Sequence, residues 1–384
     1  MSKRVLVLGA GFGGLEATSI LAEEFDGDLE IVLIDSTEGF VFGFSKLDVM
    51  FARTSADRVL HRYSDIAKPG VTFVRAEITA IDAVAKHVET TGGAFDGDFL
   101  VIALGADYDI SGTPGLAEAG HEFYSEAGAF ALRDILASFE GGDVVIGITS
   151  GPFKCPPAPS ETALMLDAML RDRGIRDSST ISLVMPFPRP IPPSPDASSA
   201  LLATFEERDI AWHPDTSVRS LDADERVAHL GDGSTLPFDL YLGVPVHRVP
   251  AVIESAGLTV DGWIPVDSRT LETSWPDVYA VGDCAAVGTP RAGVFAERQA
   301  ATAARRIAAR VRGDSEDSLY DGRGVCYVEF GGDEIGIVEV AFFDGRPRGS
   351  FEGPSLDLAA QKHEFGVSRI RRWFDRDWAA AVAE

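Results

Sequence analysis

The amino-acid sequence predicts an α/β protein built on doubly wound parallel sheets, each covered by helices on both faces to give three layers. Short runs that are apolar throughout alternate along the chain with segments of helical periodicity. A glycine-rich turn directly follows the first apolar run, as it does where a parallel strand leads into a helix. Because strands buried on both faces are apolar throughout, this pattern is typical of parallel rather than antiparallel sheets.

Residues 4–35 predict the strand–turn–helix–strand unit with which a Rossmann-like domain begins. Residues 5–8 are apolar, residues 9–14 read Gly-Ala-Gly-Phe-Gly-Gly with the G-x-G-x-x-G spacing, and a helical pattern follows. A second apolar strand, 29–34, ends at Asp35, whose carboxylate can accept hydrogen bonds from an adenosine ribose. A lone glycine motif is weak evidence, but strand, turn, helix and acid in this order predict a dinucleotide site rather than a plain tight turn.

The glycines of this unit each have a physical reason. Gly9 permits the tight turn, Gly11 lets the backbone approach a pyrophosphate, and Gly14 lets the helix pack against the strand. The helix N-terminus then faces the phosphates. The residues of this unit that we expect to contact the dinucleotide are Gly9, Gly11, Phe12, Gly13, Gly14, Asp35 and Ser36.

Residues 143–148 form a further apolar strand, at which a second Rossmann-like unit would begin. A glycine-rich phosphate turn should follow, but residues 149–161 read Thr-Ser-Gly-Pro-Phe-Lys-Cys-Pro-Pro-Ala-Pro-Ser-Glu, in which the prolines remove backbone N–H donors. The next strand, 181–185, leads into a proline-rich segment instead of ending in an acid. We therefore expect no tight NAD(P)H binding in this domain, and a degenerate site that binds weakly is the alternative.

Cys155 stands where that phosphate turn should be. It lies just before a predicted helix and beside Lys154, two features that lower the pKa of a thiol and favour the reactive thiolate. Glu161, in the first turn of the helix, could exchange protons nearby. The plainer alternatives are a buried packing cysteine, a solvated lysine and an acid that complements the helix dipole.

The composition excludes several classes of function. The chain has 384 residues, enough for two or three domains of ~100–200 residues each. Its formal net charge of −26 disfavours nucleic acid and anionic lipid as general partners. Three cysteines are too few for a disulfide scaffold but enough for one redox-active pair. With no apolar run near the ~18–20 residues that span a bilayer, and no secretory signal, we expect a cytoplasmic protein.

Residues 273–283, Thr-Ser-Trp-Pro-Asp-Val-Tyr-Ala-Val-Gly-Asp, resemble the second FAD signature of flavoproteins with two dinucleotide-binding domains. Residues 100–105 resemble the strand that ends the first FAD segment. The resemblance implies FAD as cofactor, a hydrogen bond from the ribityl chain to Asp283, and a helix over about 292–312 that points its N-terminus at the flavin. The further cofactor contacts that it implies are Ala103, Gly105, Gly282, Asp283, Val294 and Phe295.

This resemblance also predicts the domain organisation. Residues 1–111 and 246–312 would form a discontinuous FAD-binding domain, split by the second Rossmann-like domain at 112–245. Residues 313–384 would form a small α+β C-terminal domain.

Residues 154–161, Lys-Cys-Pro-Pro-Ala-Pro-Ser-Glu, resemble the cysteine segment of the flavoprotein subunit of flavocytochrome c sulfide dehydrogenase and, more broadly, of sulfide:quinone oxidoreductases. In that family a second cysteine comes from the C-terminal domain, and Cys326 matches its location. The resemblance implies that Cys155 and Cys326 form a disulfide or sulfur-bridged pair that oxidises sulfide or a related sulfur compound. Electrons would pass through FAD to quinone or to an electron-carrier protein.

Other interpretations stay open at this stage. Type II NADH dehydrogenases share the fold, and a flavin-binding redox or interaction protein without enzymatic activity is a third hypothesis. Cys284, beside the FAD signature, suits structural packing better than redox chemistry. His247 lies where the second domain returns to the first, and could relay protons or be structural. No metal site is expected.

The C-terminal segment has apolar residues at helical spacing, namely Val367, Ile370, Phe374, Trp378 and Ala381. Four arginines share this segment. It could lie on the inner membrane face to reach quinone, or pack on its own domain or a partner subunit, for instance in a homodimer. We favour packing, because only one short amphipathic segment is visible.

Overall fold

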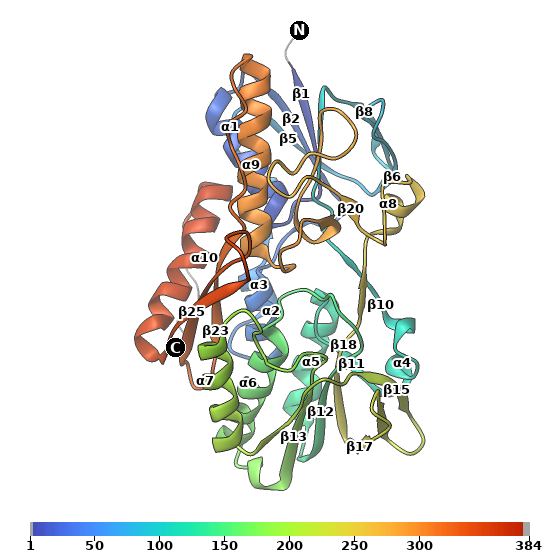
Figure 1. Cartoon of the computed structure of the whole chain (residues 1–384), viewed down its shortest axis with the longest axis vertical. Helices are drawn as coiled ribbons and strands as arrows, with labels where there is room; N and C mark the ends of the chain where they lie inside the picture. Colours follow the sequence, from blue (N-terminus) through green and yellow to red (C-terminus); the bar gives the residue numbers. More distant parts are fainter. Residues whose placement is uncertain (1–2, 379–384) are drawn as a thin grey trace.

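The computed structural model describes residues 3–378. Two α/β modules lie one above the other along the long axis, and a C-terminal sheet and helix lie along one side of both (Figure 1). The predicted mixed α/β architecture with parallel sheets is confirmed. In the described part of the chain, no helix is long and apolar enough to cross a membrane.

The first module is built on a five-stranded parallel sheet. Its strand order is β21 (Val278–Ala280), β9 (Phe99–Ile102), β1 (Arg4–Leu8), β2 (Glu30–Asp35), β5 (Val71–Arg75). The β1 residues 5–8 are fully buried, as an apolar central strand requires. The long helices α1 (Phe12–Phe25) and α9 (Gly293–Arg312) pack side by side on this sheet (Figure 1).

The second module repeats this plan with its own parallel sheet. Its strand order is β11 (His121–Glu122), β18 (Leu240–Val244), β12 (Gly142–Ile148), β13 (Ser179–Val184), β14 (Ile210–His213). Its longer helices are α5 (Glu126–Ser138), α6 (Ala158–Asp172) and α7 (Pro195–Glu207). The chain crosses between the modules through the antiparallel pair β10 (Asp107–Asp109) and β19 (Val246–Arg248).

Each module also carries a three-stranded antiparallel sheet. These are β6 (Ile78–Asp82), β7 (His87–Thr90) and β8 (Gly93–Asp96) in the first, and β15 (Val218–Asp222), β16 (Val227–Leu230) and β17 (Thr235–Pro237) in the second. The remaining short elements are β3 (Gly39–Phe40), α2 (Gly43–Met50), α3 (Ala56–Val59), β4 (His61–Arg62), α4 (Leu116–Ala119), α8 (Ala251–Ser255), β20 (Ile264–Pro265) and β22 (Ala285–Ala286).

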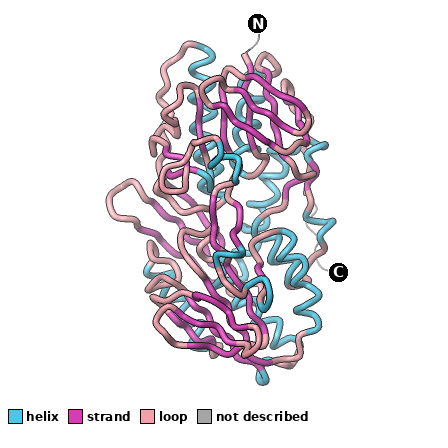
Figure 2. The backbone as a smooth tube through the Cα atoms, turned by 90° about the vertical axis from the view of Figure 1, so that its right-hand side faces the viewer, coloured by secondary structure: helices cyan, strands magenta, loops and turns pink. Residues whose placement is uncertain are grey.

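The C-terminal part is an antiparallel sheet of β23 (Arg323–Glu329), β24 (Ile335–Ala341) and β25 (Arg348–Ser355), followed by α10 (Ala359–Phe374). Figure 2, turned by a quarter from Figure 1, shows strands gathered in the upper and the lower part of the molecule, with helices beside them. The sequence places a cysteine on β23, and the strand predicted there is confirmed.

The apolar face of α10 packs on the chain itself, since Val367, Ile370, Trp373 and Phe374 are all buried. The arginines of this segment pair with carboxylates within the fold. Within α10, Arg369 binds Glu297, Arg372 binds Glu16 and Glu23, and Arg371 binds Asp377. Just beyond the helix, Arg376 binds Asp65. Of the two alternatives for this segment, packing within the protein therefore holds for the described residues, but α10 packs on α1 and α9 of the first module rather than on its own domain alone. Ala381 lies outside them.

Candidate active site

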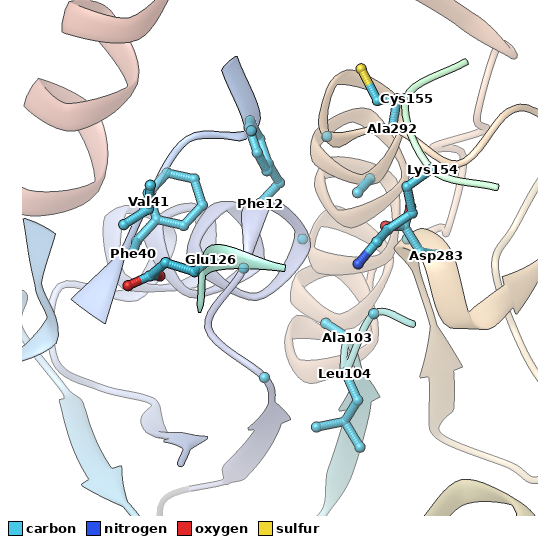
Figure 3. Close-up of a pocket in the computed structure, with 18 of the residues that line it drawn as sticks. Phe12, Phe40, Val41, Ala103, Leu104, Glu126, Lys154, Cys155, Asp283 and Ala292 are labelled. Carbon is cyan, nitrogen blue, oxygen red and sulfur yellow. The ribbon is translucent and has the colours of Figure 1, made fainter. Parts of the chain in front are cut away.

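A cavity of about 810 Å³ extends between the two modules and the C-terminal sheet. It lies at the carboxyl ends of strands β1, β2 and β9, where open α/β sheets bind their ligands. Figure 3 shows Phe12 and Phe40 on one side of it, Ala103 and Leu104 on another, and Lys154, Cys155 and Asp283 together. The predicted site residues that line it are Gly9, Gly11, Phe12, Gly13, Asp35, Ser36, Ala103, Gly105, Lys154, Cys155, Glu161, Gly282, Asp283, Val294 and Cys326.

The glycine turn has the geometry that a dinucleotide site needs. Gly9 has φ +94°, and a Cβ there would lie 2.5 Å from the Ala103 carbonyl oxygen. A Cβ on Gly14 would lie 1.8 Å from the Gly9 oxygen, so Gly14 serves helix packing and does not line the cavity. At Gly11, by contrast, no atom lies within 4 Å of a built Cβ, which leaves open space beside the backbone.

Two carboxylates flank this open space. The Ala10 amide donates to Asp35 Oδ2 at 2.7 Å, which fixes the acid against the glycine turn. Asp283 Oδ1 is buried and has no hydrogen-bond partner among the described residues, although leaving such an oxygen unsatisfied costs about 1–3 kcal/mol. Burial raises the pKa of Asp283, an effect that the nearby Lys154 and Arg291 oppose. A ligand hydroxyl would satisfy this oxygen.

Cys155 is held in a strained, left-handed conformation, with φ +47°. Its amide donates to the Arg291 carbonyl at 2.7 Å, and its own carbonyl accepts from Ala158 at 2.9 Å, where α6 begins. These two hydrogen bonds fix the backbone on either side of Cys155. The Cys155 side chain lines the cavity and is exposed.

The expectation that the environment of Cys155 lowers its pKa is wrong. The side chain is exposed to the cavity, but the cavity lies deep in the fold, and this burial raises the pKa of the thiol well above its usual value. The charge of Glu161 raises it further, whereas Lys46 opposes the rise. Lys154 does not help: its ammonium donates to the Ala106 carbonyl at 2.9 Å and points away from Cys155 (Figure 3).

Cys326 reaches the same cavity from β23. Burial and the charge of Glu161 raise the pKa of Cys326 to about 12, so this thiol is neutral. Cys155 and Cys326 influence each other electrostatically, and both are free thiols in the structure. The third cysteine, Cys284, is fully buried behind the FAD-like signature, as expected for packing.

Glu161 belongs to a buried charge network that sequence reasoning missed. Glu161 Oε1 accepts from the Glu329 amide at 3.0 Å, the Glu329 side chain binds Lys362, and Arg53 lies 3.3 Å from Glu329 and 3.6 Å from Asp48. Burial raises the pKa of Glu161 to about 7, although Lys362 opposes that rise. A carboxyl group with such a pKa can take up and release protons near neutral pH.

Lys46 is a second residue that sequence reasoning missed. It lines the cavity from α2 and donates to the Tyr124 carbonyl, and burial lowers its pKa to about 8. The chain has only six lysines, and three of them, Lys46, Lys154 and Lys362, lie in or beside this site. Of these, only Lys154 was predictable from the sequence, because it is next to Cys155.

Besides Gly14, two predicted residues lie outside the main cavity. His247 is buried behind Tyr108 and Tyr124, its Nδ1 lies 2.9 Å from the Pro245 carbonyl, and burial lowers its pKa to about 3. A neutral histidine that does not line the cavity suits the structural alternative better than a proton relay, although its buried Nε2 has no hydrogen-bond partner among the described residues. Phe295 is buried and faces a second, smaller cavity, whereas its neighbour Val294 faces the main one.

This geometry is shared with a known protein family. Residues 3–306 match the family described as pyridine nucleotide-disulphide oxidoreductase. The chain belongs to this family. A pyridine nucleotide-disulphide oxidoreductase is a redox enzyme, and the glycine turn, the parallel sheets and the shared cavity all agree with that assignment.

Two similar proteins differ in the electron donor that their names state, sulfide in one and NADH in the other. The mitochondrial sulfide:quinone oxidoreductase of Schizosaccharomyces pombe is 27% identical over 282 residues, which are 69% of this chain and 61% of that protein. A type II NADH:quinone oxidoreductase of Staphylococcus epidermidis is 27% identical over 378 residues, 88% of this chain and 90% of that protein. Among solved structures, the sulfide:quinone oxidoreductase of Aquifex aeolicus shares the fold, with TM-score 0.85, 21% identity, and coverage of 97% and 92%.

Proposed function

We propose that this enzyme uses FAD to oxidise sulfide, or a related sulfur compound, through Cys155 and Cys326, and passes the electrons to quinone. One observation carries the proposal. The two cysteines come from different parts of the chain, the turn before α6 and strand β23, yet they line one cavity together with the dinucleotide turn. Two thiols at one redox cofactor are the arrangement that two-electron sulfur chemistry needs.

The residues present fit FAD. Gly11 leaves room for a pyrophosphate, Asp35 is fixed where a ribose would lie, and the unpartnered Asp283 oxygen would accept a hydrogen bond from the ribityl chain. Bound FAD would supply an acceptor for two electrons.

The cysteines and Glu161 would carry the chemistry as follows. Hydrosulfide attacks one sulfur of an oxidised Cys155–Cys326 pair, so that a new S–S bond forms as the old one breaks, leaving a persulfide and a thiolate. Rejoining these two groups, with the extra sulfur between them, would release two electrons and the persulfide proton, and bound FAD would be the electron acceptor. The Glu161 carboxylate accepts the substrate proton, for which a pKa of about 7 is well suited.

Oxidation of NADH is the second candidate function, favoured by the extended match to the Staphylococcus epidermidis enzyme. The phosphate site after β12 argues against it. Pro156, Pro157 and Pro159 have no N–H, and the amides of Cys155 and Ala158 already donate to protein carbonyls. The start of α6 therefore offers few donors to a second pyrophosphate.

Quinone is our proposed acceptor, because both relatives are named as quinone oxidoreductases. We further propose that the enzyme works in the cytoplasm, in peripheral contact with the inner membrane face. Since the arginines of the C-terminal segment are already paired with carboxylates and the apolar face of α10 is buried, that contact would depend on side chains outside this helix.

Anaerobic reduction of the bound flavin tests the proposal. Sulfide and NADH are added separately to the FAD-loaded enzyme, and bleaching of the flavin absorbance is followed. We expect rapid bleaching by sulfide and little by NADH. Bleaching by NADH alone would assign the second candidate function instead.

The variant Cys155→Ser tests the role of the thiol. It should slow bleaching by sulfide at least ~100-fold while FAD stays bound, because one of the two sulfurs is gone. Cys284→Ala is the matched control, since Cys284 is buried and donates only to backbone carbonyls. If sulfide bleaches the flavin of Cys155→Ser at the wild-type rate, the cysteine-pair mechanism is wrong.

A further inference from the structure

A second cavity, of about 290 Å³, adjoins the main one, with which it shares the lining residues Cys326 and Ala292. Cys326 lines both cavities, and residues from the second module, α9 and β24 complete the smaller one. Its walls are apolar, and include Phe153, Pro156, Phe187, Val338, Val340 and Phe342. It has room for several small molecules, given that one water needs ~10–15 Å³ of such volume.

The cavity has few polar groups. Among the described residues, Arg291 is the one charged side chain in its lining: its guanidinium lies 3.6 Å from the Trp263 ring centroid, and only its Nε has a hydrogen-bond partner, the Asp283 carbonyl. The nearby Asp283 carboxylate acts on this positive charge and compensates it. The Thr289 hydroxyl accepts from Gln299. A small anion would lose its hydration here beside one cation that is already compensated, whereas a neutral, weakly polar molecule would lose almost nothing.

We propose that this cavity admits the substrate to Cys326 as neutral hydrogen sulfide, not as the hydrosulfide anion. The inference rests on the proposed function and specifies the form and route of its substrate. The charge of the whole molecule favours the same form, because a net charge of −26 repels an anion and leaves a neutral molecule unaffected.

Neutral hydrogen sulfide has to be deprotonated beside the cysteines before it can attack. Glu161 acts on Cys326 electrostatically and faces Lys362, Glu329 and Asp48 on its other sides. Its carboxylate takes one proton from hydrogen sulfide, and the resulting hydrosulfide attacks the disulfide of the oxidised Cys155–Cys326 pair. A new S–S bond forms as the Cys155–Cys326 bond breaks, and the displaced cysteine leaves as a thiolate. The smaller cavity thus admits neutral hydrogen sulfide, and Glu161, within its buried charge network, receives the proton.

Filling the smaller cavity tests this route. Val340 on β24 is buried and lines it, so Val340→Phe should occupy part of its volume. Ile337→Phe is the matched control, because Ile337 lies on the opposite face of the same strand and does not line the cavity. The rate of anaerobic flavin reduction by sulfide is measured for both variants and the wild type, well below and well above the pH at which hydrogen sulfide ionises.

We expect Val340→Phe to lose about tenfold in rate where the neutral form predominates, with Ile337→Phe close to wild type. Equal rates for wild type and Val340→Phe at low pH would overturn the route while leaving the proposed function intact. If sulfide fails to reduce the wild type, the proposed function itself fails. Val340→Leu, a smaller change, should show the same direction of effect if Val340→Phe does not retain FAD.

Discussion

The pKa of Glu161 is set by opposing effects of its surroundings. It lies in the first turn of α6, where the helix dipole favours a carboxylate, and it accepts a hydrogen bond from the Glu329 amide. Burial outweighs both and raises its pKa to about 7. The protein thus holds an acid that changes charge near neutral pH beside two thiols whose own pKa values are raised.

This raised pKa predicts a pH-dependent stability. The folded state holds a proton on Glu161 that the unfolded chain releases above the usual glutamate pKa of 4.5, so the free energy of unfolding falls as pH rises from 4.5 to about 7. The difference corresponds to about 3 kcal/mol. Relative to Glu161→Gln, the wild type should lose stability across this window in urea denaturation. Parallel pH profiles for the two proteins would contradict the assignment.

At the scale of elements, α10 connects the C-terminal sheet to the dinucleotide turn. Trp373 is fully buried, its Nε1 donates to Glu16 of α1 at 2.8 Å, and its ring lies 5.6 Å from that of Phe12 in the glycine turn. Phe40 and Phe42 complete this aromatic cluster. Packing of α10 therefore supports the wall of the cavity that would hold the cofactor.

Two adjacent arginines on α10 allow a matched test of this support. Arg372 binds the buried Glu16, whereas Arg371 binds the exposed Asp377 and Glu364. Arg372→Ala should lower the free energy of unfolding by about 1–2 kcal/mol and speed the release of FAD, because a buried carboxylate loses a partner. Arg371→Ala should change stability by less than about 0.5 kcal/mol. Similar effects of the two changes, followed by denaturation and flavin fluorescence, would contradict a specific role for Arg372.

The elements nearest the glycine turn were predictable because their signals are local. The spacing of residues 9–14 and the apolar runs on either side fix a strand, a turn and a helix that touch one another in the chain. The pKa of Cys155 was not predictable, because it depends on how deep the cavity lies and on Lys46, more than a hundred residues away in sequence. Contacts of Lys362 and Glu329 likewise exist only once β23 and α10 pack together.

The whole molecule carries a charge that bears on its substrate. With a formal net charge of −26, an anionic substrate would be repelled at low salt, and its association rate would rise as salt screens the field. Neutral hydrogen sulfide would not feel this field. The net charge of the molecule and the apolar cavity beside Cys326 therefore both predict that the neutral form of the substrate enters.

The dependence of the flavin reduction rate on ionic strength tests this expectation. Between about 0.01 M and about 1 M salt the Debye length falls from about 30 Å to about 3 Å. Below the ionisation pH of hydrogen sulfide, the bimolecular rate of flavin reduction should change less than about twofold over this range. A rise of tenfold or more, about 1.4 kcal/mol in the activation free energy, would identify the anion as the reacting form.

The central claim is that Cys155 and Cys326, which share one cavity, act as a redox pair. Mass spectrometry of peptides from the oxidised enzyme, digested after alkylation without a reductant, tests it most directly. We predict a cross-linked peptide that joins Cys155 to Cys326, directly or through added sulfur, and that disappears on reduction, while Cys284 stays a thiol. Separate alkylation of Cys155 and Cys326 in the fully oxidised enzyme would contradict the account.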